Sequence, residues 1–133
     1  MRYLIDTNIW IFYLKNPQSR VRERLELESP SDIAVDSIVW GELLHGARKY
    51  GDPIAREQRV TRTLAPFVCL SFDLSAAREY ARVRDELEIR GEMIGNNDLM
   101  IASIALVHNL TLVTNNVAEF SRVGGLRLED WSV

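Results

Sequence analysis

The chain has 133 residues, a net charge of −3 and a single cysteine. This length predicts one domain over residues 1–133, and 47% hydrophobic with 26% charged residues is typical of a soluble globular protein. The lone Cys69 excludes an internal disulfide framework and any multi-cysteine metal module. Because no apolar run reaches the length of a membrane span and no signal-like segment stands at the N-terminus, we expect a cytoplasmic protein without membrane contact.

Short apolar runs alternate with longer amphipathic or apolar segments along the whole chain. The runs have the length and composition of buried strands, and the longer segments those of helices. This alternation predicts an α/β fold, in which a mostly parallel sheet of four or five strands lies between layers of about seven helices. We expect strands at 2–6, 33–35, 67–72, 110–114 and 126–128. We expect helices from 7 or 8 to 16, 19 to 28, 37 to about 50, 53 to 65, 74 to 91, 98 to 109 and 117 to 120.

Polar residues at the start of each predicted helix are candidates for its N-cap. We expect this role for Thr7 or Asn8, Ser37, Asp52, Asp73, and Asn96 or Asn97. Tyr50 extends an apolar helical stripe and Cys69 is a small apolar residue, so we expect both to face inward, with Leu27 as a possible third.

Polar side chains stand where the predicted strands end. In open parallel sheets the functional crevice lies beyond the carboxyl ends of the strands. We therefore expect these residues to gather on one rim: Asp6, Asp36-Ser37, Asp73 and Thr114-Asn115-Asn116.

Asp6, Glu42 and Asp98 are the candidate chemical groups. Asp6 directly follows a buried strand, where a carboxylate is costly unless something compensates it. Helix capping is the simpler alternative for Asp6 and for Asp98, although other cap-competent residues stand beside each. Glu42 lies at the edge of a helical apolar stripe, with Gly46 keeping the next turn open; the alternative is an ordinary surface glutamate.

No histidine or cysteine accompanies these three acids, so the sequence favours a hard divalent cation with oxygen ligands, Mg²⁺ or Mn²⁺. Such a cluster suits hydrolysis of a phosphodiester, because the cation activates a water and stabilises charge on the phosphate. No phosphate-binding glycine loop and no nucleophilic serine or cysteine elbow offers another chemistry.

Four segments, in this order along the chain, closely resemble the motifs of the PIN-domain ribonucleases, and among them the VapC toxins of bacterial toxin–antitoxin pairs: Leu4-Ile5-Asp6-Thr7-Asn8, Gly41-Glu42-Leu43, Asn97-Asp98-Leu99-Met100-Ile101-Ala102 and Leu112-Val113-Thr114-Asn115-Asn116. The tail, with Glu119-Phe120 and the segment 125–131, also resembles that group. The resemblance implies a PIN-like three-layer sandwich.

By the same resemblance, Asp6, Glu42 and Asp98 match the acids of the family's metal site. Asn116 stands where many PIN domains carry another aspartate, and Glu119, one helical turn later, is the candidate substitute. Four further residues are implied as auxiliary groups that orient water or phosphate: Thr7, Asn8, Thr114 and Asn115.

The resemblance implies a Mg²⁺-dependent endoribonuclease that cuts structured RNA, tRNA or rRNA, to stop translation. It also implies a homodimer and a neutralising VapB-type antitoxin. Two alternatives stay open: a PIN-domain RNA-processing nuclease without an antitoxin, and a non-catalytic RNA-binding or interaction domain.

Two surfaces are candidates for partners. Arg48, Lys49, Arg56, Arg59 and Arg62 outnumber the acids between them and are suited to steer RNA, or alternatively form an ordinary solvated helix pair. For the antitoxin we expect an apolar surface across the first two helices, formed by Trp10, Tyr13, Leu14, Val21 and Leu25.

Overall fold

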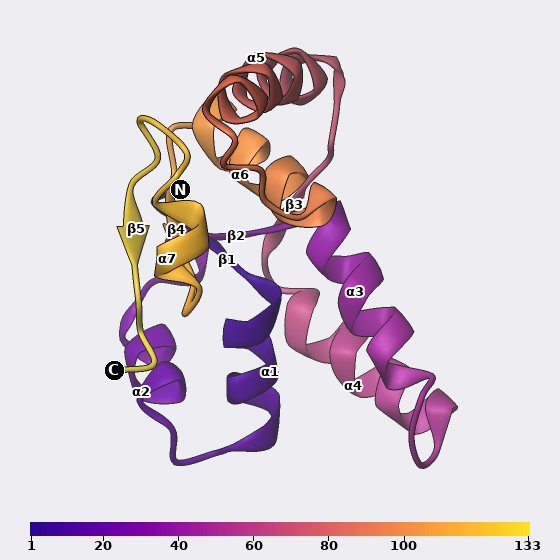
Figure 1. The fold of residues 1–133 in the computed structure, drawn as a ribbon. Coiled ribbons are helices and arrows are strands. Elements are labelled where there is room, and N and C mark those ends of the chain that lie inside the picture. The colour runs from indigo at the N-terminus through magenta and orange to yellow at the C-terminus, as the bar shows by residue number, and fades with distance from the viewer.

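A computed structural model describes residues 1–133 as a five-stranded sheet with seven α-helices (Figure 1). The strands are β1 (Tyr3–Ile5), β2 (Ile33–Asp36), β3 (Val68–Leu70), β4 (Thr111–Val113) and β5 (Leu128–Glu129). The helices are α1 (Thr7–Lys15), α2 (Arg20–Leu27), α3 (Ser37–Ala47), α4 (Pro53–Leu64), α5 (Leu74–Arg90), α6 (Asn96–Val107) and α7 (Val117–Phe120), with a short 3-10 turn η1 (Pro30–Asp32) before β2. Every predicted strand is present, with ends that differ by one or two residues.

The strand order is β3-β2-β1-β4-β5, and every neighbouring pair is parallel. The chain steps outward from β1 through β2 to β3, and then returns through α5 and α6 to β4 on the other side of β1. Because parallel crossovers are right-handed, the outward and return connections cover opposite faces of the sheet. Figure 1 shows α5 and α6 on one side of the strands and α1, α2 and α4 on the other, which confirms the layered α/β fold.

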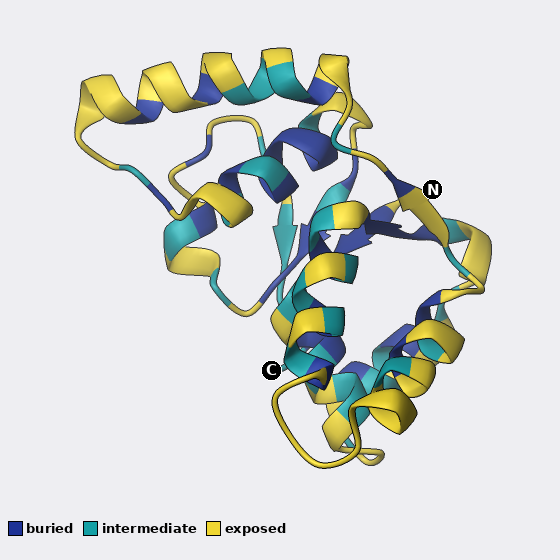
Figure 2. Ribbon diagram, turned by 90° about the vertical axis from the view of Figure 1, so that its right-hand side faces the viewer, coloured by how far each residue is buried: buried dark blue, intermediate teal, exposed yellow.

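The core follows from this layering. It contains 31 buried hydrophobic residues in one cluster. In Figure 2 the inner strands of the sheet are dark blue, the edge strands are teal or yellow, and the surrounding helices are yellow on their outer faces. The exception is α6, which is apolar nearly all round and therefore packs between α5 and the sheet with six of its residues buried.

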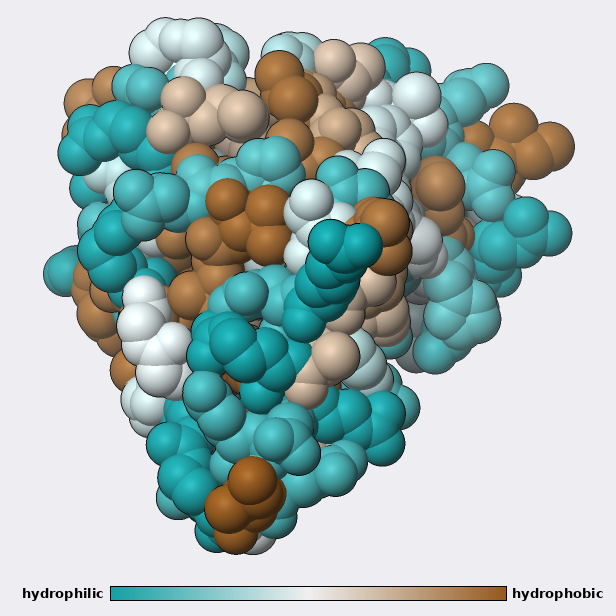
Figure 3. Space-filling model, turned by 90° about the horizontal axis from the view of Figure 1, so that it is seen from above, coloured by the Kyte–Doolittle hydropathy of each residue, from teal (hydrophilic) through white to brown (hydrophobic).

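The outer layer on that side is α5, which begins at the N-cap Asp73 and ends at the left-handed Gly91 (φ 67°). Its exposed face carries ion pairs of Arg82 and Arg84 with glutamates on the same helix. Hydrophobic and hydrophilic side chains are interspersed on this face (Figure 3). No helix of the structure is long and apolar enough to cross a membrane.

Three predicted N-caps are wrong, each by one or two residues. The caps are Asp6 before α1, Asp36 before α3 and Gly95 before α6, instead of Thr7 or Asn8, Ser37, and Asn96 or Asn97. For α1 and α3 the reason is that the chain turns immediately after β1 and β2. Asp6, directly after β1, and Asp36, the last residue of β2, therefore keep an extended backbone. The side chain of each accepts a hydrogen bond from a backbone N–H in the first turn of the next helix.

The expected burial of three residues is also wrong. Leu27 is 80% exposed because it lies nearly opposite Leu25 on the last turn of α2. Helix α3 ends at Ala47, so Tyr50 falls in the following loop and is 68% exposed. Cys69 is exposed because β3 is an edge strand.

The apolar surface expected across the first two helices is not present. Trp10, Val21 and Leu25 are buried in the core, and Tyr13 and Leu14 are half-buried against it. Trp10, Val21 and Leu25 join α1 and α2 to the sheet, so they are not available to a partner helix, and only Tyr13 and Leu14 keep part of their surface exposed.

Candidate functional site

Asp6 is the centre of the site. It follows the middle strand β1 and is only 4% exposed. Its Oδ1 accepts a hydrogen bond from the backbone N–H of Thr7 at 2.8 Å, and its Oδ2 accepts one from the Thr114 hydroxyl at 2.9 Å. The capping alternative for Asp6 is therefore confirmed for one oxygen, while the other oxygen faces the end of β4. Burial raises the pKa of Asp6 against the opposing effect of these two bonds, and the charges of Glu42 and Glu119 raise it further.

Parallel pairing brings Thr114 to Asp6. Ile5 is paired with Val113, and the Asp6 N–H donates to the Val113 carbonyl at 2.9 Å, so residues 6 and 114 leave neighbouring strands side by side. Thr114 is fully buried, and its hydroxyl also accepts the N–H of Asn116 at 3.0 Å. The hydroxyl thus connects the ends of β1 and β4.

We expect Thr114→Val to lower the free energy of unfolding by about 2 kcal/mol, because it keeps the shape but leaves Oδ2 of the buried Asp6 carboxylate without a donor. Urea denaturation in EDTA measures this loss. Thr111→Val is the matched control at the start of β4: its hydroxyl accepts only a long, exposed bond of 3.4 Å from Arg127, so the change in stability is expected to be less than about 0.5 kcal/mol. Equal losses in the two variants would contradict the role assigned to Thr114.

Glu42 is joined to the centre through Thr7. The Thr7 hydroxyl donates to Glu42 Oε1 at 2.8 Å, which connects the first turn of α1 to the middle of α3. Glu42 is half-buried, at the edge of its helical stripe as predicted. Gly46 and Glu42 line the same open groove, so the neighbourhood that the glycine was expected to keep open is open.

Asp98 lies in the first turn of α6 but does not cap it, because Gly95 is the N-cap. Burial raises its pKa to about 7, and the charges of Glu119 and Asp6 add to this effect. No cation forms a salt bridge with Asp98. The alternative that Asp98 serves as the N-cap of α6 is therefore wrong.

Glu119 is held beside Asp98 by two donors. The backbone N–H of Gly95 donates to its Oε1 at 2.9 Å, and the side-chain amide of Asn116 donates to its Oε2. Asn116 thus acts as a donor that positions Glu119. The carboxylate expected to replace the missing aspartate lies within the site.

The structure adds one acid to the site, Asp36. It ends β2, next to β1, and is fully buried. Its Oδ1 accepts the N–H of Val39 at 2.8 Å, whereas Oδ2 has no hydrogen-bond partner. Burial raises its pKa to about 7, with further contributions from the charges of Asp6 and Glu42. The sequence predicted Asp36 on the rim of the sheet, and the parallel pairing of β1 with β2 brings it close to Asp6.

The remaining polar residues of the rim form no side-chain hydrogen bond with these acids. Asn8 and Asn115 are exposed and form no side-chain hydrogen bond with them. Asp73 follows the edge strand and caps α5 through the N–H of Ala76. Of the four auxiliary residues implied by the motifs, the structure brings only Thr7 and Thr114 to the acids.

The site has an excess of negative charge and only oxygen donors. None of the five acids, Asp6, Asp36, Glu42, Asp98 and Glu119, forms a salt bridge. No three His, Cys, Asp or Glu side chains stand at the spacing of a ready-made metal cage. This arrangement fits a hard divalent ion that binds through one or two carboxylates and keeps several waters.

Comparison with known proteins agrees with the motifs. The PIN domain family matches residues 3–126, and PIN-domain nucleases use divalent metal ions. The chain is 39% identical to the tRNA(fMet)-specific endonuclease VapC of Shigella flexneri over 99% of both chains, and 39% identical to ribonuclease VapC2 of Rickettsia felis over 98% of both. It superposes with a TM-score of 0.92, at 36% identity over 98% of both chains, on a chain of DNA-bound VapBC from Salmonella typhimurium. The chain therefore belongs to the PIN-domain family, in its group of VapC ribonucleases.

Proposed function

We propose that this protein is an endoribonuclease toxin that hydrolyses phosphodiester bonds of structured RNA, tRNA or rRNA, with Mg²⁺ as its metal ion and Mn²⁺ able to replace it. The observation that carries the proposal is a group of five acids, none of which has a basic partner. Two of them stand at the carboxyl ends of β1 and β2, and the other three lie on the neighbouring helices α3, α6 and α7. Their mutual repulsion is relieved when a divalent cation binds among them.

Asp6 and Asp98 would hold the ion, partly through water, and Glu42 and Glu119 would act from the rim. When bound, the ion supplies positive charge that stabilises the scissile phosphate and favours ionisation of the attacking water. Thr7 fixes one carboxylate oxygen of Glu42 and leaves the other free to orient that water. Asp36 is buried close enough to Asp6 and Glu42 for their charges to raise its pKa, and it adds negative charge to the site when it is ionised.

The relatives suggest the biological role. One is named for cleavage of tRNA(fMet), and structures from Salmonella typhimurium and Rickettsia felis are of VapBC with DNA. We propose that residues 1–133 form one PIN domain that pairs with a VapB-type antitoxin, assembles as a homodimer and acts in the cytoplasm without membrane contact. A small upstream gene for a DNA-binding protein would support this role over that of an RNA-processing nuclease without an antitoxin.

The direct test is to incubate the purified chain with total tRNA in Mg²⁺, in Mn²⁺ and in EDTA, and to map the new RNA ends. We expect discrete cleavage products in both metals and none in EDTA. Cleavage that persists undiminished in EDTA would contradict the metal-dependent mechanism, and no cleavage of tRNA or rRNA under any condition would contradict the function.

The residues at positions 116 and 119 lead to a prediction for the number of bound metal ions and for their affinity. We expect one firmly bound ion in the RNA-free protein, because Asn116 adds no charge at the second position. Asn116→Asp places a second carboxylate beside Glu119 and should tighten Mn²⁺ binding about tenfold, whereas Glu119→Gln should weaken it. Calorimetric titration measures both, and two tight sites in the unmodified protein would show that the expectation is mistaken.

A further inference from the structure

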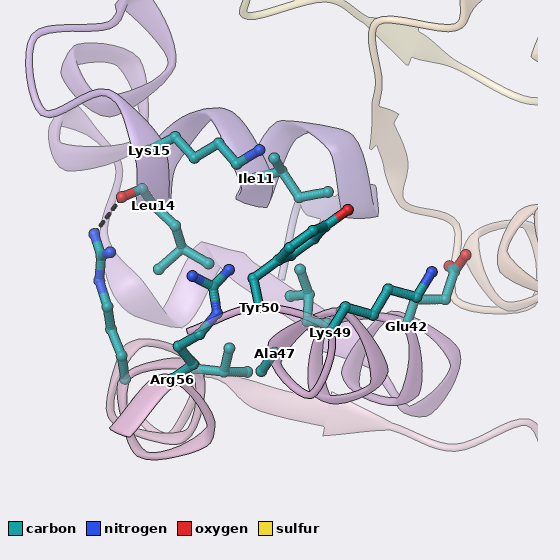
Figure 4. A pocket seen from close by; sticks show the side chains of 12 residues that line it. Ile11, Leu14, Lys15, Glu42, Ala47, Lys49, Tyr50 and Arg56 are labelled. Carbon is teal, nitrogen blue, oxygen red and sulfur yellow. Dashed lines mark hydrogen bonds between the residues drawn. The ribbon is translucent and has the colours of Figure 1, made fainter. Parts of the chain in front are cut away.

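A groove opens beside Glu42, between α1, α3 and α4 (Figure 4). Its volume is about 370 Å³, the size of a site for a small ligand. Aliphatic side chains from all three helices form the floor, among them Leu14, Leu43 and Val60. Glu42, which also accepts a hydrogen bond from Thr7, belongs to both the groove and the acidic site, so the two adjoin at this residue.

Four basic residues line this groove: Lys15, Lys49, Arg56 and Arg59. None of the four forms a salt bridge, whereas other arginines of the helices pair with nearby glutamates. Arg59 donates to the carbonyl of Leu14, and the other three have no hydrogen-bonded acceptor. Glu42 is the one acidic residue in the lining. The groove therefore carries net positive charge, whereas the neighbouring site carries net negative charge.

An aromatic ring lies among these cations. Tyr50 lines the groove and is 68% exposed, and the Arg56 guanidinium stands 5.8 Å from its ring centre. Figure 4 shows Tyr50 and Arg56 directed into the space between α1 and α3. An exposed aromatic ring beside unpaired cations is the combination that stacks a base and holds its phosphate.

We propose that the groove is the binding subsite for the single-stranded nucleotide next to the scissile bond. Its base lies against Tyr50 and the aliphatic floor, and its phosphate is held by Lys49 and Arg56. The five acids repel RNA phosphates, so the substrate needs a basic anchor within one or two nucleotides of the cut, and the groove that starts at Glu42 supplies it. This proposal rests on the proposed ribonuclease function.

The test is the binding of a fluorescein-labelled, single-stranded RNA decamer of mixed sequence, followed by anisotropy in EDTA at several salt concentrations. We expect Arg56→Gln to weaken binding severalfold and to lower the slope of log Kd against log salt by about 0.7, because one phosphate contact is lost. Tyr50→Leu should weaken binding about fivefold or more and leave the slope unchanged, since it removes stacking and no charge. Arg62→Gln is the matched control: Arg62 is exposed on the same helix, unpaired and outside the groove.

If Arg56→Gln and Tyr50→Leu both bind the decamer with the affinity of the unmodified protein, the proposal is overturned. The groove would then be a candidate site for a protein segment and not for RNA. The same conclusion follows if Arg62→Gln weakens binding as much as Arg56→Gln, or if the unmodified protein does not bind the decamer in EDTA. Cleavage of tRNA by the unmodified protein is measured in parallel. If the unmodified protein cleaves tRNA but the two variants bind the decamer as it does, the groove proposal alone is rejected, whereas absence of cleavage of both tRNA and rRNA rejects the proposed function.

Discussion

Asp98→Asn is expected to slow RNA cleavage by about a thousandfold or more, because the change keeps the shape of the side chain and removes a charge from the proposed metal site. Asp98 is suited to this test because it neither caps α6 nor pairs with a cation. Its change to asparagine therefore removes repulsion without removing a helix cap or a salt bridge, and the variant should unfold at the same temperature as the parent protein or a higher one. Single-turnover cleavage of tRNA and thermal denaturation measure the two effects.

Asp6→Asn and Glu42→Gln should also abolish cleavage and the growth arrest caused by expression, with Asp6→Asn expected to cost some stability because Asp6 accepts two hydrogen bonds. Asp85→Asn provides the control, since Asp85 is an exposed acid on α5. If Asp98→Asn retained near-parental cleavage, the assignment of the site would be wrong.

The metal-free protein is expected to be less stable at pH 8 than at pH 5.5, by about 2 kcal/mol from Asp36 and by a smaller amount from the half-buried Asp98. The pKa values of Asp36 and Asp98 are raised from 3.8 to about 7 in the folded protein. The folded state therefore binds protons that the unfolded state has released. The stability from this effect is fully present below pH 4 and is lost as the pH rises through 7.

Thermal denaturation in EDTA between pH 5.5 and 8 measures this loss. Asp98→Asn should flatten the profile, and so should Asp36→Asn, which keeps an oxygen to cap α3. Mn²⁺ should restore stability at pH 8 more than at pH 5.5, because it binds the ionised acids of the folded state. A melting temperature that is unchanged across this range in EDTA would contradict the raised pKa values.

Local patterns were sufficient to predict the layered fold and most of its elements. The helix at 117–120 agrees with α7, and the predicted burial of α6 is confirmed, because both depend on the chain's own spacing of apolar residues. The caps of α1, α3 and α6 could not be predicted as reliably, since several competent residues stand together and the exact end of a strand decides which one is used.

The same distinction applies to the site. Glu119 could be predicted from its distance along the chain to Asn116, but the role of Asn116 as its donor depends on geometry. Asp36 joins the site through the pairing of β2 with β1, which no local pattern encodes. Tyr50 faces the groove because α3 ends one turn earlier than its apolar stripe suggested.

The strand order has a consequence for protein synthesis. The middle strand β1 pairs with β4, which is made more than a hundred residues later, and Glu119 follows β4. A nascent chain that ends before Thr111 lacks Thr114, Asn116 and Glu119, and leaves Asp6 at an open edge of the sheet. A ribosome that stalls or aborts in the first four-fifths of the message therefore releases a fragment without an assembled site. The ribosomes that synthesise the protein are therefore exposed to an assembled site only once nearly the whole chain has been made.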